Sequence, residues 1–181
     1  MKIVALGDSI TAGFPYTESD SWTAILAWKL KCKVINQGIN GDDTWGMHNR
    51  FGHDVLRHQP SHVTIMGGSN DAASRLALSS VSAHFIAMID MCRENGIVPI
   101  LGMPLPILEE QGEHCLSQYR DWMRNYAAEQ NIFIIDFYKP FQERVDAGQY
   151  IELYCDLAHP SISGYALMGD IAVERFRNLF S

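Results

Sequence analysis

The sequence has few of the features that a metal site or a disulfide framework needs. Its four cysteines, Cys32, Cys92, Cys115 and Cys155, form no C-x-x-C pair. None of them combines with histidine at the spacing of metal ligands. In a chain of 181 residues such cysteines are expected to be buried or free thiols rather than disulfide partners. The sequence therefore predicts no metal.

Basic clusters and long apolar runs are also absent. The formal net charge is -7, which disfavours binding to nucleic acid and to anionic membrane surfaces. No stretch approaches the length of a membrane span, and the apolar run at the N-terminus is too short for a signal peptide. We therefore expect no nucleic-acid partner, no membrane insertion and, by default, a cytoplasmic location. The sequence leaves open whether the chain forms a homo-oligomer.

Apolar runs and helical spacings alternate along the chain. The length favours one domain spanning residues 1–181. Five short apolar runs, mostly rich in β-branched residues, predict strands at residues 3–6, 32–35, 62–66, 97–101 and 132–137. Apolar residues at helical spacing lie between them, and Ser161 is a good N-cap for a last helix. This order predicts a three-layer α/β/α sandwich around a five-stranded parallel sheet.

Polar segments follow the first three strands and precede the last helix. They read G-D-S-I at residues 7–10, N-Q-G-I-N-G-D at 36–42, G-G-S-N-D at 67–71 and D-L-A-H-P at 156–160. Ligands of parallel sheets bind beyond the carboxyl ends of the strands, so we expect these segments to meet at one rim. Together they offer the nucleophile, base and acid of serine chemistry, and loops able to aim N–H donors at an oxyanion.

In this order the four segments resemble the four blocks of the SGNH-hydrolase superfamily, also called GDSL esterases and lipases. The blocks span nearly the whole chain, and all four at these spacings are far more specific than a lone G-D-S. Two positions vary from the usual pattern: Ile10 stands where leucine is common, and Ser69 lies between the glycines and the asparagine. The resemblance implies a flavodoxin-like SGNH hydrolase fold.

The resemblance also implies a role for each matching residue. Ser9 would be the nucleophile, His159 the base and Asp156 the acid that orients the base. The backbone N–H groups of Ser9 and Gly41 and the side chain of Asn70 would form the oxyanion hole. Imidazole suits proton transfer near neutral pH, and a serine hydroxyl is a poor nucleophile until a base removes its proton.

Alternatives exist for two of these roles. Asp136 ends the fifth predicted strand and is a rival orienting acid. Ser69 is a minor alternative nucleophile, because residues 67–71 begin like a G-x-S-x-G elbow but end in aspartate. The rim loops also offer side chains that could line an acyl pocket: Phe14, Tyr16, Trp45, Met103, Leu105 and Ile107.

The implied activity is that of a serine ester hydrolase, a GDSL-type esterase, lipase or acylhydrolase that needs no cofactor and acts on a small-molecule ester. One domain leaves little chain for a lid, and Pro104 and Pro106 are expected to stiffen the longest rim loop. We therefore expect short- to medium-chain carboxylic esters as substrates. The same site would suit a thioesterase, a lysophospholipase or a carbohydrate acetylesterase.

A second class of function is a flavodoxin-like ligand-binding module without catalysis. Such a module should carry a Ser/Thr-rich phosphate loop after the first strand. Residues 7–13 read G-D-S-I-T-A-G, which matches poorly, and the chain has no G-x-G-x-x-G or G-K-[ST] motif. An intact hydrolase fold that only binds esters is a third alternative, which an unreactive Ser9 would favour.

Overall fold

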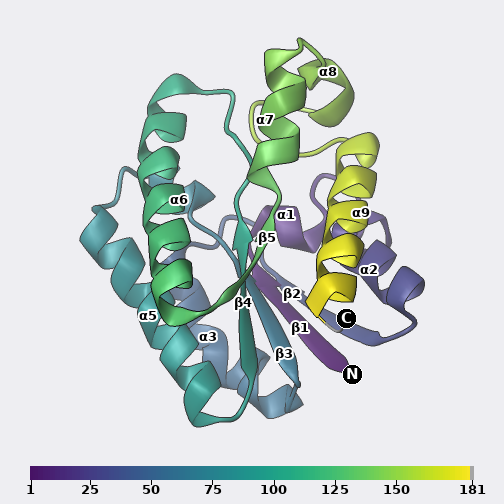
Figure 1. Ribbon diagram of the computed structural model, residues 1–181. Helices are drawn as coiled ribbons and strands as arrows, with labels where there is room; N and C mark the ends of the chain where they lie inside the picture. Colours follow the sequence, from purple (N-terminus) through teal and green to yellow (C-terminus); the bar gives the residue numbers. More distant parts are fainter. Residues whose placement is uncertain (180–181) are drawn as a thin grey trace.

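A computed structural model describes residues 1–179 of the chain. Five parallel strands form one sheet in the order β2-β1-β3-β4-β5 (Figure 1). Their bounds are Lys2–Gly7 for β1, Lys33–Gly38 for β2, His62–Met66 for β3, Val98–Met103 for β4 and Phe133–Asp136 for β5. The five predicted strands are confirmed, and β3 has the predicted bounds.

Helices cover both faces of the sheet, as Figure 1 shows. On one face lie α3 (Thr44–Asp54), α5 (Leu78–Glu94) and α6 (Glu110–Gln130), and on the other lie α2 (Trp22–Leu30), α7 (Tyr138–Asp146), α8 (Tyr150–Leu153) and α9 (Ile162–Leu179). Two short helices at the strand ends are α1 (Ser9–Ala12) and α4 (Ser69–Ala73). The predicted three-layer α/β/α sandwich is confirmed.

The interior strand β1 shows why both layers are needed. Successive side chains of a strand point to opposite faces. Val4 and Leu6 belong to the core under α3, α5 and α6, whereas Ile3 and Ala5 belong to the core under α2 and α9. All four side chains are fully buried, which explains why β1 is a continuous apolar run rather than an alternating one.

The helices α7 and α8 occupy a part of the chain where the sequence analysis predicts no element. Phe141 is the buried residue of α7 and Leu153 that of α8. Tyr138, Phe141 and Val145 do recur at helical spacing in α7, a signal that the sequence analysis misses, whereas the four residues of α8 are too few for a repeat. The predicted cap of the last helix is present, since the Ser161 hydroxyl accepts the Gly164 N–H at 3.1 Å.

The register of the sheet brings three polar segments to the same level. Gly7 at the end of β1 pairs with Gly38 of β2 and with Met66 of β3. Because β1 lies between β2 and β3, the chain moves from β1 to one side of the sheet and then to the other. A reversal of this kind opens a crevice at the carboxyl ends of the strands. No helix within residues 1–179 combines the length and the apolar character of a membrane span.

Candidate active site

Ser9 lies where β1 turns into α1. The backbone of Asp8 is extended, and its carboxylate accepts the Ile10 N–H at 2.9 Å, which caps the helix. Ser9 is thereby held as the first residue of α1, with only 7% of its surface exposed. Burial raises the pKa of Asp8 to about 6, although the Ile10 N–H and nearby His159 act in the opposite direction.

Ser9, His159 and Asp156 form a continuous hydrogen-bonded chain. The Ser9 Oγ lies 2.9 Å from His159 Nε2, and His159 Nδ1 lies 2.7 Å from Asp156 Oδ2. The other Asp156 oxygen accepts the backbone N–H groups of Ala158 at 2.8 Å and of His159 at 2.7 Å. Partial burial opposes ionisation of Asp156, but the backbone and imidazole hydrogen bonds hold its pKa below the usual range. The arrangement suits a neutral imidazole with its proton on Nδ1 and a lone pair facing the serine hydroxyl.

The loops after β2 and β3 bring donors to the same place. Gly41 has φ +77°, a left-handed conformation that residues with a Cβ rarely adopt. The Asn70 side-chain amide donates one hydrogen to the Asp42 carbonyl at 2.8 Å. An amide NH2 group has two donors, so this bond orients the second. A cavity of about 210 Å³ lies between these groups, lined by Ser9, Phe14, Asn40, Gly41, Asn70 and His159.

A second cavity, of about 260 Å³, adjoins the same serine and histidine. Besides Ser9, Asn70 and His159 it is lined by residues from α1, α4, the loop after β4, the start of α6 and the loop of residues 154–161, here called the catalytic loop, namely Ile10, Ser69, Ala73, Ile107, Glu109, Gly112, Leu157 and Ala158. Most of these side chains are small or apolar. The arrangement therefore offers a nucleophile with a base between two small pockets.

Residues 5–167 match the GDSL-like lipase/acylhydrolase family. The chain belongs to this family. The predicted superfamily is thereby confirmed, and the chain is a hydrolase of ester bonds.

Individual relatives agree in fold and length to different degrees. A G-D-S-L family protein from Desulfitobacterium hafniense DCB-2 superposes with a TM-score of 0.87 at 33% identity, covering 96% of this chain and 98% of that protein. Esterase TesA from Pseudomonas aeruginosa is 26% identical over 167 residues, which are 89% of this chain and 80% of the esterase. A lipoprotein of Bacillus subtilis, YqeF, is 35% identical over 130 residues, 65% of this chain. The match spans only 54% of that lipoprotein.

Of the predicted pocket residues, two lie at the site of this GDSL hydrolase. The Phe14 ring meets the His159 ring edge-on, with 4.7 Å between centroids, and lines the smaller cavity. Ile107 lines the second cavity. Phe14 therefore confines the imidazole as well as bounding the pocket.

The other expected pocket residues lie elsewhere. Met103 and Leu105 line neither cavity, because both are buried in the core, one on each side of the sheet. Trp45 is 60% exposed on α3, and it also lines neither cavity. Tyr16 packs edge-on against Tyr165. The topology correctly places these residues near the rim, but it does not give the direction of their side chains.

The rival residues are placed differently from the hydrogen-bonded chain. The Asp136 carboxylate accepts the Lys139 N–H at 3.1 Å, in the first turn of α7. Ser69 begins α4 and lines the second cavity, whereas the imidazole is bonded to Ser9. Within residues 1–179 no group of three His, Cys, Asp or Glu side chains could hold a metal ion.

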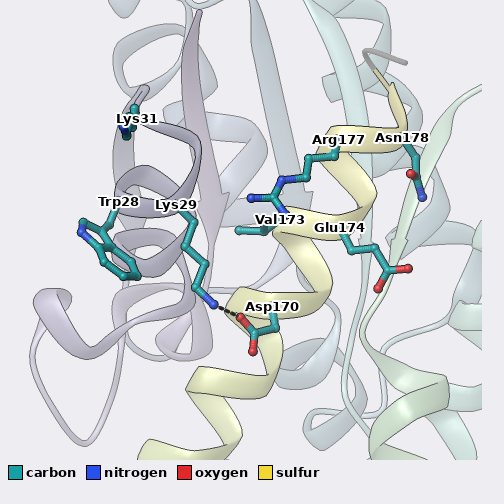
Figure 2. A pocket seen from close by; sticks show the side chains of 8 residues that line it. All are labelled: Trp28, Lys29, Lys31, Asp170, Val173, Glu174, Arg177 and Asn178. Atoms are coloured by element: carbon teal, nitrogen blue, oxygen red, sulfur yellow. Dashed lines mark hydrogen bonds and ion pairs between the residues drawn. The ribbon is translucent and has the colours of Figure 1, made fainter.

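A larger cavity, of about 770 Å³, lies between α2 and α9 (Figure 2). Exposed Trp28 and the ion pair between Lys29 and Asp170 form part of its wall. It is lined by no serine or histidine and by none of the four sequence blocks. Size alone therefore does not mark the reactive site in this molecule.

The sequence analysis misses one residue that contacts two of the four blocks. Arg50 on α3 donates to the Gly7 carbonyl and to the Asp42 carboxylate. Its ion pair with Asp54, four residues on, is the one contact that sequence spacing could have suggested. The other two partners depend on the fold.

Proposed function

We propose that this enzyme hydrolyses short- to medium-chain carboxylic esters through an acyl-enzyme formed on Ser9. The observation that carries the proposal is the bonded chain from the Ser9 hydroxyl through His159 to Asp156, with distances of 2.9 and 2.7 Å. A serine, a base and an orienting acid in this arrangement are the parts that acyl transfer requires.

In the first half-reaction Ser9 Oγ attacks the ester carbonyl carbon and its proton passes to His159 Nε2. The carbonyl π electrons move onto oxygen, where the N–H groups of Ser9 and Gly41 and the Asn70 amide stabilise the charge. When the carbonyl reforms, the bond to the leaving oxygen breaks. His159 then donates its proton to that oxygen, which releases the alcohol.

The second half-reaction repeats these steps with water. His159 Nε2 accepts a proton from water as the oxygen attacks the acyl carbon, and the proton returns to Ser9 Oγ when the acid leaves. The lowered pKa of Asp156 keeps its carboxylate ionised beside the imidazolium that forms twice in each cycle. Phe14 against the ring limits the positions that His159 can take.

The two cavities suit the two sides of an ester. We assign the acyl chain to the apolar cavity bounded by Ala73, Ile107 and Leu157. Its volume of about 260 Å³ is small, which supports acyl groups of a few carbons. A thioesterase, lysophospholipase or carbohydrate acetylesterase would use the same serine and differ in the leaving group. The cytoplasmic location stays a prediction. One relative is named a lipoprotein, a name that points to a different location for that protein.

The decisive experiment is labelling with a fluorophosphonate, followed by mapping of the modified residue. We expect the label on Ser9, and we expect Ser9→Ala to lose about 10⁴–10⁶-fold in kcat. Ser69→Ala is the matched control and should be labelled like the wild type. A label on Ser69, or full activity of Ser9→Ala, would reject the proposed nucleophile.

A further inference from the structure

Arg50 lies beside the candidate active site without lining its cavities. Its side chain is 14% exposed on α3 and donates to three acceptors. Nε bonds Asp42 Oδ2 at 2.7 Å, one terminal nitrogen bonds Asp54 Oδ2 at 2.9 Å, and the other bonds the Gly7 carbonyl at 2.9 Å. A planar guanidinium can satisfy three such acceptors at once in fixed directions, which an ammonium group cannot.

Two of these acceptors belong to the segments that carry the proposed oxyanion donors. Gly7 ends β1, two residues before Ser9. Asp42 directly follows Gly41, and its carbonyl accepts the Asn70 amide at 2.8 Å. Arg50 therefore bonds residues that lie two positions before Ser9 and one position after Gly41. The third donor, the Asn70 amide, is joined to the same Asp42 by one further hydrogen bond.

Packing leaves the Asp42 carboxylate little freedom. A Cβ at Gly46 would overlap Asp42 Oδ1, because α3 passes directly against that oxygen. The other oxygen of the same carboxylate is the one bound by Arg50. The turn after β2 is thus held between the backbone of α3 and the partly buried guanidinium of Arg50.

We propose that Arg50 is a positioning residue that fixes the spacing between Ser9 and the other two oxyanion donors. This inference rests on the proposed function, since it acts through the donors assigned there. Donors in an oxyanion hole are effective because they are fixed before the charge develops. A misplacement of about 1 Å can cost about 10²-fold in rate.

The two carboxylates on Arg50 provide a matched pair of variants. Asp42 and Asp54 have side chains of nearly equal exposure, 12% and 13%. Only Asp42 lies in the turn after β2, next to the proposed donor Gly41. We expect Asp42→Ala to lower kcat by about 10²-fold with KM changed by less than about threefold. Asp54→Ala should change kcat by less than about threefold. Equal losses of kcat in the two variants would overturn the positioning role.

Variants of Arg50 itself test whether catalysis depends on the planar, forked arrangement of the guanidinium donors. Arg50→Gln should lower kcat by about 10²-fold. Arg50→Lys should recover only part of that loss, because lysine keeps the charge but lacks the planar, forked donors of the guanidinium.

Inhibitor binding provides a second measurement. An alkylboronic acid forms a tetrahedral adduct on the serine, and its affinity for Arg50→Gln should fall by the same factor as kcat/KM. Unchanged boronate affinity in an active, folded Arg50→Gln protein would reject the proposal. Should Arg50→Gln not fold, Gly46→Ala displaces the same carboxylate and replaces it in these measurements.

A double-mutant cycle with Asn70→Ala separates this inference from the proposed function. If Arg50 acts through the oxyanion hole, the losses of Arg50→Gln and Asn70→Ala in kcat will be less than multiplicative. Fully multiplicative losses would mean that Arg50 acts elsewhere. Activity that survives Ser9→Ala would instead reject the proposed function, whatever the Arg50 variants do.

Discussion

At the scale of single residues, Asp156 holds the catalytic loop through more than the imidazole. One oxygen accepts His159 Nδ1, and the other accepts two backbone N–H groups of the same loop. The carboxylate therefore fixes both the ring tautomer and the backbone that carries the ring. An amide in its place would present N–H donors to Nδ1 and favour the wrong tautomer.

The first prediction compares this acid with Asp136. Asp156→Asn should lower kcat by up to about 10⁴-fold. Asp136→Asn should lower kcat by less than about threefold, because asparagine can still accept the Lys139 N–H. Steady-state kinetics on one ester, with circular dichroism to verify folding, measures both. If Asp136→Asn loses more activity than Asp156→Asn, the acid of the triad comes from β5.

The second prediction uses the buried carboxyl next to the nucleophile. Because the pKa of Asp8 rises from 3.8 to about 6 on folding, the folded chain binds this proton more tightly than the unfolded chain does. The contribution of Asp8 to stability therefore falls as the pH rises from about 4 to above 6, by about 3 kcal/mol at most. Asp8→Asn keeps a capping oxygen but does not titrate.

Urea unfolding of both proteins across this pH range tests the prediction. The free energy of unfolding of the wild type minus that of Asp8→Asn should decrease as the pH rises through about 4 to 6. Two curves that stay parallel would show that Asp8 does not carry a raised pKa.

At the scale of elements, the loop after β4 forms one wall of the apolar cavity and is held at four successive residues. The carbonyls of Leu105 and Pro106 accept Arg120 Nη1 at 3.3 Å and the Tyr154 hydroxyl at 2.8 Å. The next two N–H groups bond the Glu113 carboxylate at 2.9 Å and the Leu157 carbonyl at 2.7 Å. The last of these joins the loop directly to the catalytic loop. Hydrogen bonds as well as the two prolines therefore restrain this wall.

The third prediction removes one of these bonds. Tyr154→Phe leaves the Pro106 carbonyl without its partner and should lower the free energy of unfolding by about 1–2 kcal/mol. Because the loosened segment carries Ile107, KM should rise while kcat changes little. Tyr150→Phe, at an exposed tyrosine of the same helix region, is the control and should behave like the wild type. A lower kcat at unchanged KM would place the effect on the catalytic loop instead.

The elements differ in how far the sequence predicts them. Strands β1, β3 and β4 are mostly buried and form continuous apolar runs, and the partly buried edge strands β2 and β5 keep short ones, so all five strands could be found. The four polar blocks could be found too, because each is local in sequence and three of them follow strands, which determines the edge of the sheet where they lie. Side-chain directions could not, which is why Met103 was expected in the pocket and lies in the core. Arg50 could not be found either, since its partner Gly7 is 43 residues away.

At the scale of the whole molecule, the sheet and its connections bring four segments that are distant in sequence together at one site. Ser9 and His159 are 150 residues apart in sequence and are in hydrogen-bond contact. Three blocks start at neighbouring strand ends in fixed register. The fourth is joined to the loop after β4 through the Leu108 N–H and Leu157 carbonyl. Precision at the site is therefore a property of the complete sheet and its two helical layers.

The last prediction concerns the size of the substrate, which the whole molecule limits. The apolar cavity assigned to the acyl chain has a volume of about 260 Å³, below the roughly 300–1,000 Å³ of sites that enclose a whole drug-sized ligand. The restrained loop after β4 gives the apolar cavity little room to grow. Each further methylene contributes about 0.8 kcal/mol only while it can be buried.

The specificity constant should therefore stop rising after the first few carbons of the acyl group. On p-nitrophenyl esters we expect kcat/KM to peak between acetate and hexanoate and to fall for acyl chains of about twelve carbons, once their ends stay in water. Tyr154→Phe should shift the peak toward longer chains if the loop sets the limit. A steady increase out to palmitate in the wild type would contradict the small pocket and favour a role on long-chain lipids.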